Sequence, residues 1–236
     1  MVEIWEGKSI GILREDPLLL KAAKSGVFGS SLIYPKGAVY QALFTYLCGM
    51  PDEEFFHAHS ELFCGTYLVC MSKEWEDFIR RQSIQVILRR TMMKPRLGAS
   101  SKQKPLLPPG YTISLFTPEI FDAHPFGHGT NYQNFEDFRC RGSGAAVFYE
   151  GKIVSSASSF MTFGQDVELD VSTEPEHRKK NLAHACVHRL MEDCAKRNLV
   201  IHWDAQNPAS QKMALAHGFE EEQSYAVYIL QHKTGT

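Results

Sequence analysis

Residues 171–183 read Val-Ser-Thr-Glu-Pro-Glu-His-Arg-Lys-Lys-Asn-Leu-Ala. The segment begins inside a strand, because residues 167–173 alternate apolar with polar side chains, which indicates one packed face. A helix follows, because apolar residues recur at helical spacing over 182–194. The turn between them places three cations beside the free amides of a helix start, a combination that suits a diphosphate. A solvated basic turn explains the same residues equally well.

The segments around this turn predict a small mixed sheet flanked by helices. Glu150-Gly151 is typical of a two-residue hairpin, and the apolar run 199–205 follows the first helix, so its strand should lie parallel to the strand before that helix. Asn207 and Pro208 are typical of a helix start, and Gly218 of a helix end. The expected strands are 145–149, 152–160, 167–173, 199–205 and a closing strand at 224–230, with helices over 182–194 and 208–217.

A domain boundary is expected where residues 95–110 accumulate Pro, Gly, Ser and Lys without apolar periodicity. The predicted domains are 1–98, a linker over 99–106, and 107–236. The first should be a smaller α/β domain, to which we assign no chemistry. Its expected helices are 15–27 and 73–81, and its expected strands are 30–35, 65–71 and 83–90. The basic run 89–104 is read as solvated linker in preference to a nucleic-acid arm.

Two motifs in register resemble those of the GNAT superfamily. Arg178, Asn181 and Ala183 fall on the acyl-CoA loop pattern of Gln or Arg, two residues, Gly, one residue, and Gly or Ala. Residues 207–219 are similar to the family's second motif, which begins with Asn and ends with Gly-Phe. Residues 142–159, 168–183 and 203–219 are more narrowly similar to the subgroup that includes zwittermicin A resistance acetyltransferases. The implied fold class is α/β (α+β): a C-terminal GNAT fold with a mixed, mostly antiparallel sheet, preceded by the smaller domain.

The resemblance implies an N-acetyltransferase that moves an acetyl group from acetyl-CoA, a co-substrate, to a small-molecule amine by direct attack. Two strands of such a fold splay apart and take the pantetheine arm between them, and a backbone amide near Val171 serves the oxyanion. The residues implied to bind the coenzyme are Val171, Thr173, Arg178, Lys179, Lys180, Asn181, Leu182, Ala183, Asn207 and Ser210. Asn207 is equally explained as a helix cap.

The sequence departs from the family pattern at two positions. Asn181 stands at a glycine position, where a left-handed backbone costs an asparagine roughly 1 kcal/mol. Ala214 stands where many members carry the tyrosine that protonates coenzyme A. Tyr225 or Tyr228 is a substitute acid, or else a core tyrosine. Glu168 is the candidate general base, or else an ordinary exposed strand residue.

Composition narrows the partners. A formal net charge of −2 disfavours nucleic acid and anionic membrane surfaces. The charged N-terminus, the lack of long apolar runs and the cysteines without CxxC spacing predict a cytoplasmic protein. The self-association considered for it is a homodimer. His184 and His188 have helical metal-ligand spacing but no third ligand, so no metal site is expected. The competing hypothesis is a non-catalytic acyl-CoA-binding or protein-interaction module on the same fold.

Overall fold

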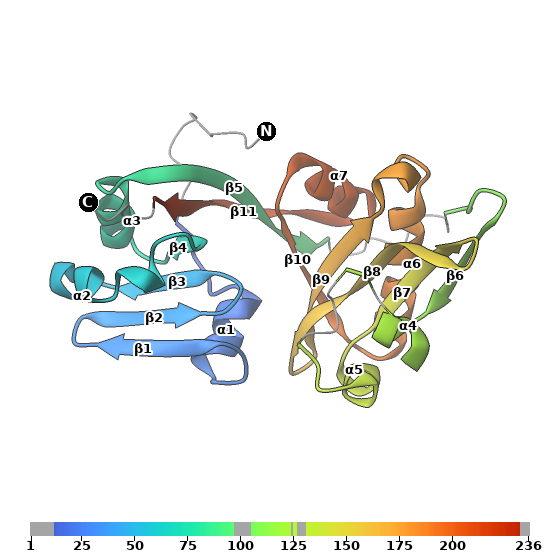
Figure 1. The fold of residues 1–236 in the computed structure, drawn as a ribbon, viewed down its shortest axis with the longest axis horizontal. Helices are drawn as coiled ribbons and strands as arrows, with labels where there is room; N and C mark the ends of the chain where they lie inside the picture. Colours follow the sequence, from blue (N-terminus) through green and yellow to red (C-terminus); the bar gives the residue numbers. More distant parts are fainter. Residues whose placement is uncertain (1–11, 97–104, 124, 127–130, 232–236) are drawn as a thin grey trace. The chain divides into compact units, whose positions relative to one another are not determined.

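The computed structural model describes residues 12–96, 105–123, 125–126 and 131–231 (Figure 1). These residues form two compact units. The first contains the described residues up to Met92 together with those from Glu222 onward, and the second extends from Met93 to Glu221. The linker expected at 99–106 lies mostly outside the described residues. Residues 222–231 had been expected in the C-terminal domain, but they belong to the N-terminal unit.

The N-terminal unit contains a mixed sheet with strand order β1-β2-β3-β4-β11-β5. β1, β2 and β3 form an antiparallel meander, and β4 is parallel to β3. The element bounds in this part of the chain are α1 Leu18–Lys24, β1 Ser30–Tyr34, β2 Gly37–Gln41, β3 Thr45–Gly49, α2 Glu53–Ala58, η1 Ser60–Leu62, β4 Leu68–Cys70, α3 Lys73–Arg80 and β5 Ile84–Pro95.

The second unit has the fold class expected from the sequence. Its strand order is β6-β7-β8-β9-β10-β5; the strands β6 to β9 are antiparallel and β10 is parallel to β9. The bounds are β6 Tyr111–Leu115, α4 Pro118–Ala123, α5 Phe135–Arg141, β7 Gly144–Tyr149, β8 Lys152–Phe163, β9 Asp166–Thr173, η2 Pro175–His177, α6 Leu182–Lys196, β10 Val200–Ala205, α7 Pro208–Ala216 and β11 Phe219–Leu230. The hairpin turn at Glu150-Gly151 is confirmed, with φ of 48° and 76°.

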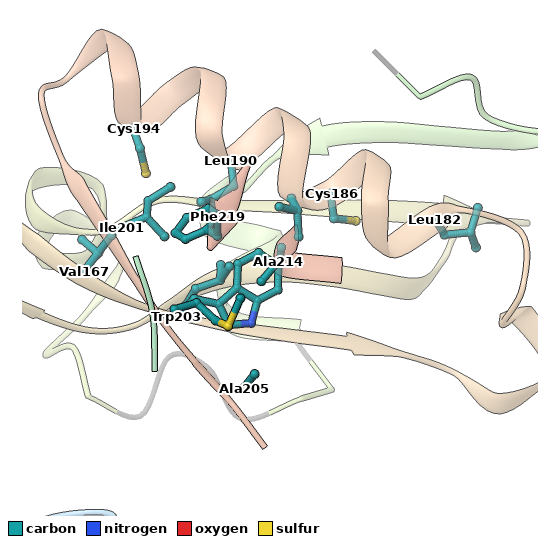
Figure 2. Close-up of a cluster of buried hydrophobic side chains, with 14 of the residues drawn as sticks. Val167, Leu182, Cys186, Leu190, Cys194, Ile201, Trp203, Ala205, Ala214 and Phe219 are labelled. Carbon is teal, nitrogen blue, oxygen red and sulfur yellow. The ribbon is translucent and has the colours of Figure 1, made fainter. Parts of the chain in front are cut away.

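The core of the second unit lies between α6 and its sheet. Leu182, Cys186, Leu190 and Cys194 project from one face of α6 toward Trp203 and other residues of the strands (Figure 2). These four side chains are at most 1% exposed. Burying this stripe fixes the direction of α6, and therefore places the start of α6 at the end of β9.

The last strand departs from the sequence-based expectation. It was expected to close the C-terminal sheet, but Tyr228 of β11 pairs antiparallel with Leu68 of β4 in the N-terminal unit. Conversely, β5 begins in the N-terminal unit, and its residue Met93 is 4% exposed within the core of the second unit. Strands β5 and β11 therefore each contribute to both units (Figure 1).

Candidate functional site: the start of α6 and the opening between β9 and β10

The loop between β9 and α6 has an unusual backbone. Lys179 and Asn181 have φ of 61° and 59°, in the left-handed region that favours glycine. The sequence comparison predicted this conformation for Asn181, where the loop motif has glycine. Asparagine adopts this region more readily than lysine does. The backbone at Asn181 thus has the left-handed conformation that glycine adopts readily, and the backbone at Lys179 has the same conformation.

The first turn of α6 carries no side-chain cap. Other helices of the described chain are capped by Asp52 before α2, Ser72 before α3, Asn134 before α5 and Asn207 before α7. Asn181 precedes α6, but its side chain accepts no hydrogen bond from the amides of the first turn. A helix of 15 residues with an uncapped start is well suited to hold an anion, because its amides and its dipole both favour negative charge. Leu182 and Ala183 contribute amides to this turn.

The cations of the loop are held outside the helix start. Arg178 donates from Nε to the carbonyl oxygen of Thr173 at 3.2 Å. Lys180 Nζ lies 2.9 Å from the hydroxyl of Tyr111 and 3.3 Å from the carbonyl oxygen of Glu176. Both side chains are exposed, and none of these contacts involves an amide of the α6 start, so they add positive charge without occupying those amides.

Tyr111 is a neighbour of the loop that sequence reasoning missed. Its hydroxyl lies 2.9 Å from both Lys180 Nζ and His177 Nδ1, and its ring is 4.7 Å from that of Tyr149. No local signal in the sequence identifies it, because Tyr111 is 66 residues away from His177 and is positioned by the pairing of β6 with β7.

Strands β9 and β10 separate next to this loop. Their paired residues are Val200 with Asp166, Ile201 with Val167 and His202 with Glu168, and the pairing ends there. Val171 and Thr173 of β9 therefore lie past the last paired residue, where β9 and β10 both continue without pairing to each other; this unpaired stretch is called the opening between β9 and β10.

The ladder between β8 and β9 fixes the direction of the Val171 amide. The amide of Glu174 donates to the carbonyl oxygen of Val154 at 2.9 Å, and Val171 is opposite Ala157 in the same register. In an antiparallel ladder hydrogen-bonded pairs alternate with pairs that exchange no backbone bond, and the second kind includes Val171 with Ala157. The N–H of Val171 consequently points away from β8, into the opening.

Two carboxylates of β9 bind backbone amides on the two sides of this opening. Asp170 Oδ1 accepts from the N–H of Val171 at 2.8 Å, and Glu168 Oε1 accepts from the N–H of Asp204 on β10 at 3.2 Å. Glu168 was named from the sequence as a candidate base, whereas Asp170 was noted only as a polar member of the alternating strand. The alternation placed both on one face of the sheet, but it contained no sign of the bond to Val171.

Helix α7 begins with residues that have structural partners. Asn207 accepts from the N–H of Ser210 at 2.9 Å, which confirms the cap, and Ser210 Oγ accepts from Trp203 Nε1 at 3.0 Å. Ala214 is fully buried in the core. His217, at the end of α7, lies 3.1 Å from His184 on α6, measured between Nε2 and Nδ1. Burial lowers the pKa of His184.

The structure does not support Tyr228 as the acid. Tyr228 is fully buried in the core of the N-terminal unit, where its hydroxyl donates to Glu76 at 2.9 Å. Burial, together with that carboxylate, raises its pKa far above the usual value, so the phenol is committed to a structural contact. Tyr225 is 1% exposed and lies in the same unit.

The described residues contain neither a metal cluster nor a membrane-spanning helix. No group of three or more His, Cys, Asp or Glu side chains among them is arranged to hold a metal ion. None of the helices in the described part of the chain is both long enough and apolar enough to cross a bilayer.

Several solved structures have the same fold as this chain. A GCN5-related N-acetyltransferase-like protein from Streptococcus suis is 23% identical, with a TM-score of 0.74 over 90% of this chain and 92% of its own. A GCN5-related N-acetyltransferase from Kribbella flavida is 10% identical, with a TM-score of 0.59 over 92% and 97%. A tandem GNAT protein from the clavulanic acid biosynthesis pathway is 13% identical, with a TM-score of 0.53 over 81% and 78%. These likenesses show the fold.

No curated protein matches the chain. The sequence model of the family described as GNAT acetyltransferase, in contrast, matches residues 25–228 and so includes most of both units. The chain therefore belongs to the GNAT acetyltransferase family.

Proposed function

We propose that the protein is an N-acetyltransferase that transfers the acetyl group of acetyl-CoA to the amine of a small molecule by direct attack. The uncapped start of α6, adjacent to the opening between β9 and β10, is the observation that carries this proposal. The first feature suits a diphosphate and the second a pantetheine arm, which can bind as an added strand. The diphosphate and the pantetheine arm are adjacent parts of one ligand, coenzyme A.

The residues proposed to hold the coenzyme follow from this placement. The amides of the α6 start would bind the diphosphate, and the cations of the loop would add charge next to it. The edges of β9 and β10 would contact the pantetheine arm, and the first turn of α7 would complete the site. The proposed set is Val171, Thr173, Arg178, Lys179, Lys180, Asn181, Leu182, Ala183, Asn207 and Ser210.

The proposed chemistry needs few side chains. The neutral amine attacks the thioester carbon, and the carbonyl oxygen becomes an oxyanion that accepts from the N–H of Val171. The C–S bond then breaks, so the sulfur leaves as a thiolate while the amine loses a proton. Glu168, held by the Asp204 amide beside the opening, is the proposed acceptor of that proton. Ala214 offers no acid, so we assign protonation of the thiolate to water.

The proposal does not specify which amine accepts the acetyl group. Within the family we place the chain near the subgroup that includes zwittermicin A resistance acetyltransferases, because residues 142–159, 168–183 and 203–219 resemble that subgroup. Membership of this subgroup does not define the acceptor amine. The alternative function is a non-catalytic acyl-CoA-binding or protein-interaction module, which Ala214 favours because the usual acid is missing. Both hypotheses include coenzyme binding, and they differ only in turnover.

Calorimetry with acetyl-CoA, followed by a panel of small amines, tests the proposal. We expect saturable binding of acetyl-CoA and, with at least one amine, release of free thiol detected by a thiol-reactive dye. Binding without thiol release from any amine would favour the non-catalytic alternative. Protein that binds neither acetyl-CoA nor coenzyme A at millimolar concentration would refute both.

A further inference from the structure

The carboxylate of Asp170 accepts a hydrogen bond from the backbone amide of Val171, the amide to which the proposed chemistry assigns the oxyanion. Its Oδ1 accepts from the N–H of Val171 at 2.8 Å, and this N–H points into the opening between β9 and β10. A backbone amide has one hydrogen. It cannot donate at full strength to the Asp170 carboxylate and to the carbonyl oxygen of a thioester at the same time.

The bond between Asp170 and Val171 differs from its counterpart across the opening. Glu168 accepts from the amide of Asp204, which lies on β10 and is not the amide assigned to the carbonyl oxygen. Both carboxylates lie on the face of β9 opposite the core residues Leu169 and Val167. They therefore carry equal charge on the same strand and face, but only Asp170 competes for the Val171 amide.

We propose that Asp170 is a specificity-determining residue that makes the site distinguish acyl-CoA from free coenzyme A. Its carboxylate holds the Val171 amide until a thioester carbonyl displaces it. This inference rests on the proposed function, because it takes the Val171 amide as the group that binds the carbonyl oxygen.

The consequence is a difference in affinity between two ligands that share every other group. Acetyl-CoA must break the bond between Asp170 and Val171 in order to place its carbonyl oxygen. Free coenzyme A has no acyl carbonyl and leaves the bond intact. After the acetyl group has been transferred, the carboxylate returns to the amide, so the bond favours the product complex over the substrate complex.

The test compares the dissociation constants of acetyl-CoA and coenzyme A for the wild type and four variants of the full chain by calorimetry. In Asp170→Ala the competing acceptor is absent, and we expect acetyl-CoA to bind roughly tenfold more tightly relative to coenzyme A than it does to the wild type, the scale of one charge-assisted hydrogen bond. Removal of the negative charge strengthens both ligands alike, because both carry the same phosphates, so the effect cancels in the ratio. Asp170→Val also removes the competing acceptor and should show the same change in the affinity ratio. Valine is favoured in strands, so this variant serves if the alanine variant does not fold.

Two matched variants isolate the bond from the charge. Asp170→Asn removes the charge but keeps an oxygen that can accept from Val171, so the affinity ratio should stay near that of the wild type. Glu168→Ala removes a carboxylate from the same face without changing the Val171 amide, and its ratio should also stay near the wild-type value.

Each outcome has a definite meaning. If the wild type binds both ligands and the ratio is unchanged in Asp170→Ala and Asp170→Val, Asp170 does not compete for the amide and the inference is wrong. If Glu168→Ala shifts the ratio as far as Asp170→Ala does, general charge accounts for the effect and the inference is also wrong. If the wild type binds neither ligand, the proposed function itself fails.

Discussion

At the residue scale, the candidate site depends on where the loop cations are held. Arg178 donates to the carbonyl oxygen of Thr173, so its guanidinium is held at the end of β9, the strand that precedes the uncapped start of α6. The position is exposed, which means that the side chain contributes little to the free energy of unfolding. A role in binding and a role in stability can therefore be separated at this residue.

We predict that Arg178→Glu weakens the binding of acetyl-CoA by about tenfold or more, because it replaces a cation beside the proposed diphosphate site with an anion. The melting temperature should change little. Lys196→Glu is the matched control, since it makes the same charge change at an exposed position in the last turn of α6. Calorimetry and thermal melts on the three proteins decide the matter, and equal affinities for all of them would refute the phosphate role of Arg178.

At the element scale, the sequence predicted the elements that depend on neighbouring residues, but it did not predict contacts between segments that are distant in the chain. The strands at 145–149 and 152–160 and the helix over 182–194 were predicted because hairpin turns and apolar periodicity depend on neighbouring residues. Helix α5 was not predicted, and Tyr111 was not placed at the loop. The bond between Asp170 and Val171 could not be predicted either, because it depends on the exact end of the pairing between β9 and β10.

The contact between α6 and α7 should make stability depend on pH. His184 lies against His217, and burial holds the pKa of His184 below its ordinary 6.5. A histidine with a lowered pKa favours the folded state while it is neutral, so its contribution is present above pH 6.5 and is lost as the pH falls through the folded pKa.

We expect the melting temperature of the wild type to fall between pH 7.5 and pH 5, and expect His184→Gln to reduce that fall, because glutamine does not titrate. Thermal melts across this pH interval measure both slopes. His57→Gln serves as a control at an exposed histidine. Identical slopes for wild type and His184→Gln would show that burial of this imidazole has no bearing on the pH dependence.

At the scale of the whole molecule, the two units repeat one order of elements. Three antiparallel strands, a helix, a parallel strand, a helix and a further strand occur as β1 to β5 with α2 and α3, and again as β7 to β11 with α6 and α7. Strand β11, the last of the second series, lies between β4 and β5 in the first unit, while β5 lies beside β10 in the second. The sequence could not reveal this exchange, because residues 224–230 have the same pattern whichever sheet they join.

The exchange predicts that a fragment cut at the expected domain boundary will not fold well. Residues 107–236 lack Met93, which is buried in the core of the second unit. The fragment also retains Ala226, Tyr228 and Leu230, which are buried in the core of the N-terminal unit and would be left exposed. We expect aggregation, or a melting temperature well below that of the full chain, by circular dichroism. A fragment that unfolds cooperatively at the same temperature as the full chain would contradict this.

The repeated order raises the question of whether the N-terminal unit has a second coenzyme site, and its chemistry predicts that it has none. The turn that corresponds to the loop before α6 leads into α2, where Asp52 accepts from the N–H of Phe55 at 3.0 Å and Glu53 and Glu54 occupy the first turn. A capped, acidic helix start of this kind repels a diphosphate. Calorimetry should therefore give one coenzyme A per full chain. Arg178→Glu should weaken that single site and reveal no second one, while Asp52→Ala should leave the stoichiometry unchanged. Two equivalents bound to the wild type would show that the N-terminal unit, too, holds the coenzyme.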